Sequence, residues 1–262
     1  MSALTQGLNS QQLAAVKHEG SPLLVVAGAG SGKTRVLTRR IAYLLAERSV
    51  APFEVLAITF TNKAAGEMKE RVAQLVGDRA KVMWVSTFHS ACVRILRREA
   101  SLLGYSNSFT IYDQSDCLRL INIVMKDLNL DVKKYAPRAV AALISQAKNE
   151  LLGPADYLNQ SKDHFQEIVA QVFAIYQQRL SSANSMDFDD LIAKTVEVMQ
   201  RHPEVRAKYR SRFKHILVDE YQDTNHAQYV LIKELVGNER DGISPAELCV
   251  VGDADQSIYA LS

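Results

Sequence analysis

This 262-residue sequence predicts an α/β fold in which a parallel sheet is interrupted by an all-helical insertion. Short apolar runs rich in Val, Ile and Leu are typical of strands buried on both faces of a parallel sheet. Segments with helical periodicity separate the first three runs, which gives the strand and helix alternation of α/β proteins. Between residues 86 and 215 the pattern changes to successive amphipathic helices with hardly a strand. The runs are Leu23–Ala27, Val55–Thr59, Val82–Ser86, His215–Val218 and Leu248–Val251.

The first predicted strand leads into a glycine-rich segment, Ala27-Gly28-Ala29-Gly30-Ser31-Gly32-Lys33-Thr34, and a helix is predicted from Arg35 to Leu45. Such a turn binds phosphate, because its backbone N–H groups converge and the helix dipole adds positive potential. Lys33 can neutralise the outer phosphates of a nucleotide, and the Thr34 hydroxyl can ligate magnesium. The usual motif begins with glycine where this chain has Ala27, but the glycines that follow still form the turn. We therefore predict a nucleotide phosphate site over the whole segment.

Polar segments follow the second and third predicted strands. Phe60-Thr61-Asn62-Lys63 leads into a helix predicted over Lys63–Val76, and Thr87-Phe88-His89-Ser90 repeats the layout. An aromatic ring can stack on a nucleic-acid base, while small polar side chains and helix N-terminal amides can contact phosphates. The alternative is that Thr61 and Ser90 cap helices and that both phenylalanines belong to the core. From each segment taken alone, this alternative is favoured.

The expected insertion consists of amphipathic helices joined by turns. Linkers rich in Gly, Pro, Ser and Asn separate the helical segments and are typical of turns. The segments span Ser90–Leu103, Ser115–Leu128, Arg138–Asn149, Phe165–Leu180 and Asp187–Gln200.

Acidic and polar residues follow the last two predicted strands. Asp219 and Glu220 end the fourth strand, at the edge of an open α/β sheet where nucleotides bind. Asp219 would hold magnesium and Glu220 would orient and deprotonate the water that attacks the γ-phosphate. A solvated acidic turn is the alternative, but the phosphate loop upstream favours the functional interpretation. After the fifth strand, Gln256 has the donor and acceptor groups to contact a γ-phosphate or its attacking water, while Tyr259 suits a functional role and core packing equally.

Composition excludes several classes of protein. The 31 basic residues are nearly matched by 29 acidic ones, so net charge does not indicate a nucleic-acid partner. No apolar run approaches the length of a membrane span, and no signal peptide is evident, so we expect a cytoplasmic protein with no membrane partner. The three cysteines are far apart in apolar surroundings, which predicts core thiols. The histidines lack metal-ligand spacing, which argues against a structural zinc site.

Together these segments resemble the N-terminal part of the UvrD/Rep/PcrA group of superfamily 1 DNA helicases, over essentially the whole chain. Their order and combined length make an accidental similarity negligible. The segment Asp187-Phe188-Asp189-Asp190-Leu191 resembles the D-F-D-D-L segment of that family, although helix capping and packing alone would also explain it. The other matches are Leu8–Gln12 to the Q motif, Ala27–Thr34 to motif I, Thr59–Ala65 to motif Ia, Ser86–His89 to motif Ib, Val218–Asn225 to motif II and Gly252–Tyr259 to motif III.

The resemblance implies ATP and Mg²⁺ as cofactors and single-stranded DNA as the partner. It assigns Gln12 to the adenine edge and Arg35 to the base or sugar region of the nucleotide. It implies 3′ to 5′ movement on single-stranded DNA, coupled to ATP hydrolysis, and separation of the duplex at junctions. Accessory repair or replication proteins are further expected partners. The residues that it assigns to single-stranded DNA, against the core alternative above, are Phe60, Thr61, Asn62, Lys63, Thr87, Phe88, His89 and Tyr259.

The resemblance also predicts the domain organisation. A RecA-like ATP-binding core is expected over residues 1–89 and 187–262, with a helical subdomain inserted at 90–186. The family carries its arginine fingers and motifs IV to VI on a second RecA-like domain, which lies outside these 262 residues. Losing such an arginine costs about 10³ to 10⁵ in rate, so we expect this chain to bind nucleotide weakly and hydrolyse it poorly.

One segment departs from the family pattern. After Tyr259 the family continues with an aromatic residue and Arg-Gly, whereas this chain has Ala260-Leu261-Ser262, which removes one base-stacking contact.

Three alternatives to a helicase of this group remain at this point. A noncatalytic module that binds ATP and single-stranded DNA is one alternative, and it would show no DNA-stimulated turnover. The motor part of a RecB or AddA type helicase-nuclease is another. A small-molecule kinase is disfavoured, because nothing indicates an acceptor pocket and Glu220 suits activation of water.

Overall fold

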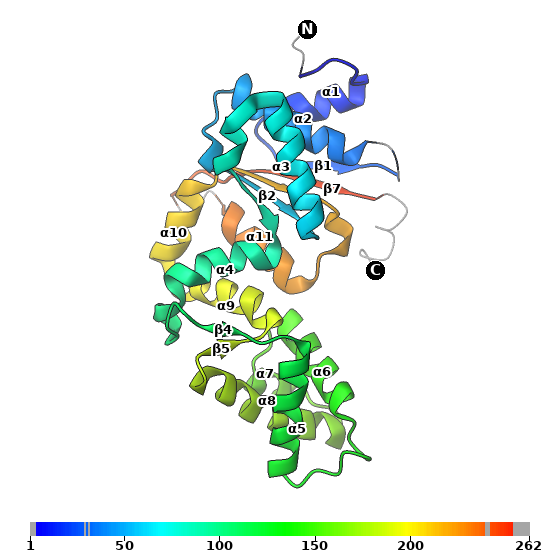
Figure 1. Cartoon of the computed structure of the whole chain (residues 1–262), viewed down its shortest axis with the longest axis vertical. Coiled ribbons are helices and arrows are strands. Elements are labelled where there is room, and N and C mark those ends of the chain that lie inside the picture. Colours follow the sequence, from blue (N-terminus) through cyan, green and yellow to red (C-terminus); the bar gives the residue numbers. More distant parts are fainter. Residues whose placement is uncertain (1–3, 29, 31, 239–241, 254–262) are drawn as a thin grey trace. The chain divides into compact units, whose positions relative to one another are not determined.

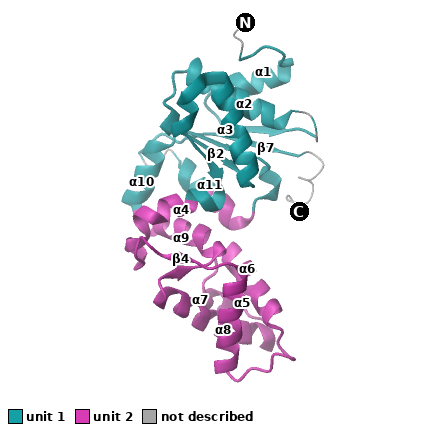
Figure 2. Ribbon diagram, viewed as in Figure 1, with its two compact units in different colours: residues 1–91, 203–224, 232–262 teal, residues 92–202, 225–231 magenta. Residues whose placement is uncertain are grey.

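The computed structural model describes residues 4–28, 30, 32–238 and 242–253. The chain divides into two compact units (Figure 2). Unit 1 comprises residues 1–91, 203–224 and 232–262, and unit 2 comprises residues 92–202 and 225–231. Helices α4 (Phe88–Glu99) and α11 (His226–Val236) each contain the point where the chain passes from one unit to the other.

Unit 1 contains a five-stranded sheet whose paired strands are all parallel, in the order β1-β7-β6-β2-β3 (Figure 1). The register pairs Thr59 with Thr87 and Ile58 with Val218, so the carboxyl ends of three neighbouring strands lie together. The predicted parallel sheet is thereby confirmed. Its strands are β1 (Leu23–Val26), β2 (Val55–Thr59), β3 (Trp84–Thr87), β6 (His215–Val218) and β7 (Glu247–Gly252).

Helices α2 (Lys33–Ala46) and α3 (Asn62–Val76) cover one face of this sheet. Leu37 and Ile41 of α2 and Met68 of α3 are fully buried against alternate residues of the strands, such as Ala57 and Leu217. Apolar residues at a period of about 3.6 give each helix a single buried stripe, and the strand period of two sends alternate side chains to that face. Unit 1 also contains α1 (Ser10–Lys17), α10 (Pro203–Arg212) and the 3₁₀ turns Pro52–Glu54, Gly77–Val82 and Tyr221–Asp223.

The other face of the sheet buries aromatic side chains at β3. Trp84 is 1% exposed and packs edge-on against Phe213, with ring centroids 5.1 Å apart. The ring of Tyr209 in α10 stacks on the ring of Phe213, with centroids 6.3 Å apart. The short helix α10 is therefore held by aromatic contacts rather than by a long apolar stripe.

Unit 2 is helical, with a core formed by α5, α6 and α8. Val124, Ile144, Val172 and Phe173 are at most 2% exposed within this core. The segments β4 and β5 form a two-residue parallel pair, which the sequence did not indicate. The elements of unit 2 are 3₁₀ turn Ala100–Leu103, β4 (Thr110–Ile111), α5 (Gln114–Asp127), α6 (Pro137–Asn149), α7 (Pro154–Asn159), α8 (His164–Ser182), β5 (Ser185–Met186) and α9 (Phe188–Arg201).

The boundary of unit 2 differs from the expected insertion at its C-terminal side. The sequence placed residues 187–262 with the core, whereas residues 187–202 and 225–231 lie in unit 2. The reason is a buried ion cluster: Lys148 of α6 contacts Asp187 at 2.6 Å and Asp190 at 3.0 Å, which attaches the start of α9 to the helical unit. Among the described residues, no helix is long and apolar enough to cross a bilayer.

Candidate nucleotide and nucleic-acid site

The glycine-rich segment connects β1 to α2 as predicted. Ala27 continues the strand pairing by donating its N–H to the Gly252 carbonyl at 3.1 Å. Gly30 and Gly32 have positive φ angles of 75° and 88°, a conformation that favours glycine. Gly32 is the N-cap of α2 and provides no side-chain cap, so the first N–H groups of the helix face the segment without that usual partner. Ala29 and Ser31, also predicted to bind phosphate, lie outside the described residues.

A cavity of about 620 Å³ opens beside this segment within unit 1. Its size falls in the range of small-molecule and cofactor sites. It brings together residues from the glycine-rich segment, from α3 and from the ends of β6 and β7, all at the carboxyl edge of the sheet. The lining residues are Gly30, Gly32, Lys33, Thr34, Arg35, Arg71, Glu220, Gln222, Asp223 and Asp253.

Lys33 forms ion pairs with two of the acidic residues that line this cavity. Its ammonium nitrogen lies 3.1 Å from Asp253 Oδ2 and 3.6 Å from Glu220 Oε2. Burial opposes the lysine charge, but the hydrogen bond with Asp253 and the charge of Glu220 outweigh it and raise the pKa of Lys33. The lysine is therefore held as a cation at the mouth of the phosphate loop.

The predicted acidic pair follows β6. Asp219 is 6% exposed, and burial together with the neighbouring Glu220 charge raises its pKa. Glu220 adopts the left-handed conformation, with φ 49°, and its N–H donates to Asp219 Oδ1 at 3.1 Å. The two carboxylates differ in exposure to the cavity: Glu220 lines it, whereas the buried Asp219 is not among the lining residues.

Gln222 links the two acidic strand ends. Its Nε2 donates to Glu220 Oε2 at 2.9 Å, and its Oε1 accepts from the Asp253 N–H at 3.0 Å. Sequence reasoning gave no role to Gln222 or Asp253, although both lie in segments that it singled out. Arg71 of α3 was also missed, because nothing in the sequence around it distinguishes a cavity-lining arginine from one on a solvated helix face.

The structure brings Gln12 and Arg35 to the same loop. A Cβ at Gly32 would lie 3.3 Å from Gln12 Nε2 and 3.8 Å from the Arg35 Cβ. Gln12 Oε1 accepts from the Asn9 N–H at 3.2 Å, and Asn9 Oδ1 accepts from the Gln12 N–H at 2.8 Å. This capping box fixes the start of α1 and the orientation of the Gln12 amide. Arg35 donates to the carbonyl of Gly7, just before α1.

The segments predicted to contact DNA lie at the same edge of the sheet, after β2 and β3. Thr61 is the N-cap of α3 and accepts from the Ala64 N–H at 3.1 Å. Thr87 accepts from the Ser90 N–H at 3.2 Å, so Thr87 rather than Ser90 is the capping residue there. Asn62 Oδ1 lies 3.5 Å from Ser90 Oγ, which brings the two segments together. Asn62 and Lys63 are exposed, and His89 is half-buried, which lowers its pKa.

The two phenylalanines are not equivalent. Phe88 is 2% exposed, so its ring has no face available for a base, and the core alternative holds for this residue. Phe60 is half-buried and meets the edge of Phe88, with ring centroids 5.7 Å apart at 72°. Phe88 therefore supports Phe60. Gln256 and Tyr259 lie outside the described residues.

Comparison with known proteins agrees with this geometry. The ATP-dependent DNA helicase UvrD1 of Mycobacterium tuberculosis is 61% identical over 262 residues, which cover 98% of this chain and 34% of that protein. The ATP-dependent DNA helicase PcrA of Staphylococcus aureus is 54% identical over 259 residues, which cover 99% of this chain and 35% of that protein. The chain thus spans about a third of the length of these relatives. A family model described as the UvrD/REP helicase N-terminal domain matches residues 8–261, and the chain belongs to this helicase family.

Proposed function

We propose that this chain carries the ATP-binding half-site and part of the single-stranded DNA surface of an ATP-dependent DNA helicase. One observation supports this most strongly: a single cavity joins the glycine-rich loop, Lys33 and Glu220 at the carboxyl edge of a parallel sheet. Open α/β sheets bind nucleotides at that edge. The named relatives are ATP-dependent DNA helicases.

Lys33 and the first N–H groups of α2 are the proposed phosphate ligands. The ion pairs of Lys33 with Asp253 and Glu220 show that the ammonium can reach the acidic side of the cavity. Bound phosphates would compete with these carboxylates for Lys33 and leave Glu220 free to accept a proton from water. Arg71 supplies further positive charge to the same cavity.

Thr34 and Asp219 suit magnesium because both offer oxygen ligands, the type that Mg²⁺ prefers. The raised pKa of Asp219 indicates a buried carboxylate that a nearby cation would stabilise. No group of three or more His, Cys, Asp or Glu side chains forms a metal site among the described residues. An Mg²⁺ ion held by Thr34 and Asp219 would take its remaining ligands from water and from the nucleotide phosphates, whose charge it would shield.

Phe60, Thr61, Asn62 and Lys63 are the proposed DNA contacts at the end of β2. Phe60 is braced edge-on by the buried Phe88, which leaves it the better placed of the two rings to stack on a base. Thr87 ends the next strand, β3, and His89 follows it at the start of α4. Stacking tolerates any base, which suits movement along a strand.

The test is binding of Mg-ATP to this chain, with hydrolysis measured with and without a single-stranded oligonucleotide. We expect Lys33→Ala to abolish binding, and Glu220→Gln to bind as the wild type does. Turnover should stay near the Glu220→Gln level, because the resemblance assigns the arginine fingers to a second domain. Unchanged Mg-ATP binding in Lys33→Ala would refute the proposed site. DNA-stimulated turnover that Glu220→Gln removes would instead show that these residues suffice for catalysis.

Phe60→Ala tests the DNA surface separately. Loss of one base–aromatic stack should weaken binding of a single-stranded oligonucleotide by about 1–3 kcal/mol and leave Mg-ATP binding intact. The matched control is Phe53→Ala, because Phe53 is also a phenylalanine with an accessible ring but lies in a 3₁₀ turn at the amino end of β2. Equal oligonucleotide affinity in Phe60→Ala and the wild type would remove Phe60 from the DNA surface.

A further inference from the structure

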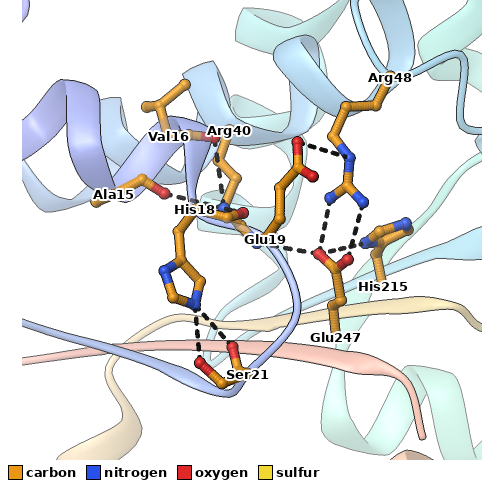
Figure 3. A network of polar contacts seen from close by, with 9 residues as sticks. All are labelled: Ala15, Val16, His18, Glu19, Ser21, Arg40, Arg48, His215 and Glu247. Atoms are coloured by element: carbon orange, nitrogen blue, oxygen red, sulfur yellow. Dashed lines mark hydrogen bonds and ion pairs between the residues drawn. The ribbon is translucent and has the colours of Figure 1, made fainter.

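A cluster of charged side chains (Figure 3) lies at the amino ends of β6 and β7, whereas the nucleotide cavity lies at the carboxyl edge of the sheet. Glu247, the first residue of β7, accepts from Arg48 Nη1 at 2.8 Å and Nη2 at 2.9 Å. Arg40 Nη2 lies 3.5 Å from the same carboxylate, and so does Nδ1 of His215, the first residue of β6. We call these four residues, Arg40, Arg48, His215 and Glu247, the anchor cluster.

Arg40 has a second set of partners on α1. Its Nη1 donates to the carbonyls of Ala15 at 2.9 Å and His18 at 2.8 Å, with Val16 at 3.4 Å. The last carbonyls of a helix have no partner within the helix, and a buried carbonyl without one is costly. Arg40 is only 1% exposed, so its guanidinium serves α1 and Glu247 rather than solvent. It therefore fixes the C-terminal end of α1 to the side of α2.

The other end of α1 carries Gln12, and the other end of α2 carries the phosphate loop. Gln12 lies against Gly32, with its amide oriented by Asn9. Lys33 and Arg40 belong to the same helix, about two turns apart. A contact that fixes α1 on α2 at one end therefore sets the position of Gln12 over the phosphate loop at the other.

We propose that Arg40 is a positioning residue for recognition of the nucleotide base. By holding α1 on α2 it places the Gln12 amide beside the phosphate loop, so that base binding and phosphate binding occur on one rigid frame. The inference rests on the proposed function and on the further expectation, drawn from the resemblance, that Gln12 contacts the adenine edge.

Arginine is needed here because one planar fork must serve carbonyls on one side and a carboxylate on the other. A lysine offers a single ammonium on a flexible stem and cannot hold both partners in this fork geometry. The structure therefore predicts a specific defect in Arg40→Lys: the phosphate loop on α2 stays intact while α1 loosens.

The experiment compares the affinity of the chain for Mg-ATP and for Mg-tripolyphosphate, which lacks the base and sugar. In Arg40→Lys we expect ATP affinity to fall roughly 5- to 100-fold, the worth of one bidentate base contact, and tripolyphosphate affinity to stay within about twofold. Amide hydrogen exchange should speed up in α1. Arg40→Gln, which keeps amide donors without charge, gives the same comparison if Arg40→Lys does not fold.

Arg48→Lys is the matched control, because Arg48 binds the same Glu247 carboxylate, and its second ion pair, at 3.6 Å, is with Glu19 beyond the end of α1. We expect it to keep the wild-type ratio of ATP to tripolyphosphate affinity. A double-mutant cycle adds a readout that general loosening would not give: in a Gln12→Ala background, Arg40→Lys should cause no further loss of ATP affinity.

Three results would overturn the proposal: a parallel fall for both ligands in Arg40→Lys, unchanged ATP affinity, or additive losses in the cycle. These results differ from failure of the proposed function. A wild-type chain that binds neither ligand, or a Gln12→Ala variant that binds ATP as the wild type does, would refute the site itself before Arg40 is tested.

Discussion

Removing the charge of Lys148 is the sharpest test of what holds the helical unit together. Lys148 is 3% exposed and lies 2.6 Å from Asp187 and 3.0 Å from Asp190, which are themselves buried. Tyr176 donates to Asp187 at 2.8 Å, and Gln177 donates to Asp190 at 3.1 Å. Burial raises the pKa of Asp190, and the Lys148 ammonium opposes that rise. The lysine is thus the cation that makes two buried carboxylates tolerable.

Lys148→Met keeps a flexible, unbranched side chain of similar size and removes the ammonium group, with its charge and its hydrogen bond to Asp187. Breaking a buried ion pair by removing one partner costs about 3–5 kcal/mol, because the remaining charge stays desolvated without compensation. With a urea m-value near 2 kcal/mol/M, the midpoint of unfolding should fall by roughly 2 M. The loss should appear in helical circular dichroism during a urea titration.

Two variants control this measurement. Lys126→Met removes an exposed lysine from α5 and should stay within about 0.5 kcal/mol of the wild type. Adding Asp190→Asn to Lys148→Met should recover part of the stability, since it removes one of the uncompensated carboxylates. Exposed ion pairs contribute at most about 1 kcal/mol. A loss of stability below that value for Lys148→Met would refute the argument that the buried ion pairs of Lys148 with Asp187 and Asp190 hold unit 2 together.

Two further predictions concern unit 1. Gly32→Ala should weaken Mg-ATP binding and lower stability by about 1–2 kcal/mol, because φ is +88° and the new Cβ would lie 3.3 Å from Gln12 Nε2. Thermal unfolding measures the change in stability. Gly66→Ala, inside α3 with open space around it, should be neutral or stabilising in that assay, and equal effects of Gly32→Ala and Gly66→Ala would contradict this reasoning. Burial alone would raise the pKa of Glu247, but the hydrogen bond from Arg48 and the charges of His215 and Arg48 together outweigh it, so the pKa lies below its usual 4.5. A lowered carboxyl pKa adds stability above the unfolded value and loses it as the pH falls through the folded value. The difference in free energy of unfolding between the wild type and Glu247→Gln should therefore shrink as the pH falls below about 4.5. A difference that is constant with pH would count against a lowered pKa of Glu247.

Much of the nucleotide site could be predicted from the sequence because its chemistry is local. The glycine-rich loop, Lys33 and Thr34 are neighbours in the chain, and a strand before them and a helix after them suffice to place them. Asp219 and Glu220 were found because parallel strands all end at the same edge of the sheet. The D-F-D-D-L segment proved to include a helix cap, as one interpretation held: Asp187 accepts from the Asp190 N–H at 2.8 Å.

Other features depended on residues far apart in the chain. Which phenylalanine is buried could not be predicted, since Phe60 and Phe88 occupy matching positions after neighbouring strands and differ only in what surrounds them. The boundary after residue 202 was missed because Lys148 attaches α9 to the helical unit across 39 positions in the chain.

The sequence by itself determined the elements whose information is local: the five strands of the main sheet, the helices with clear apolar periodicity, the phosphate loop and the acidic turn. Propensity, periodicity and turn chemistry act over a few residues and need no tertiary context. Only the tertiary structure decided which distant charges meet, such as Lys33 with Asp253 and Arg40 with Glu247. A charged side chain has no periodic signature. Whether it stays in solvent or is buried beside a partner depends on how distant elements pack, as with Lys33 and Asp253, which are 220 positions apart in the chain.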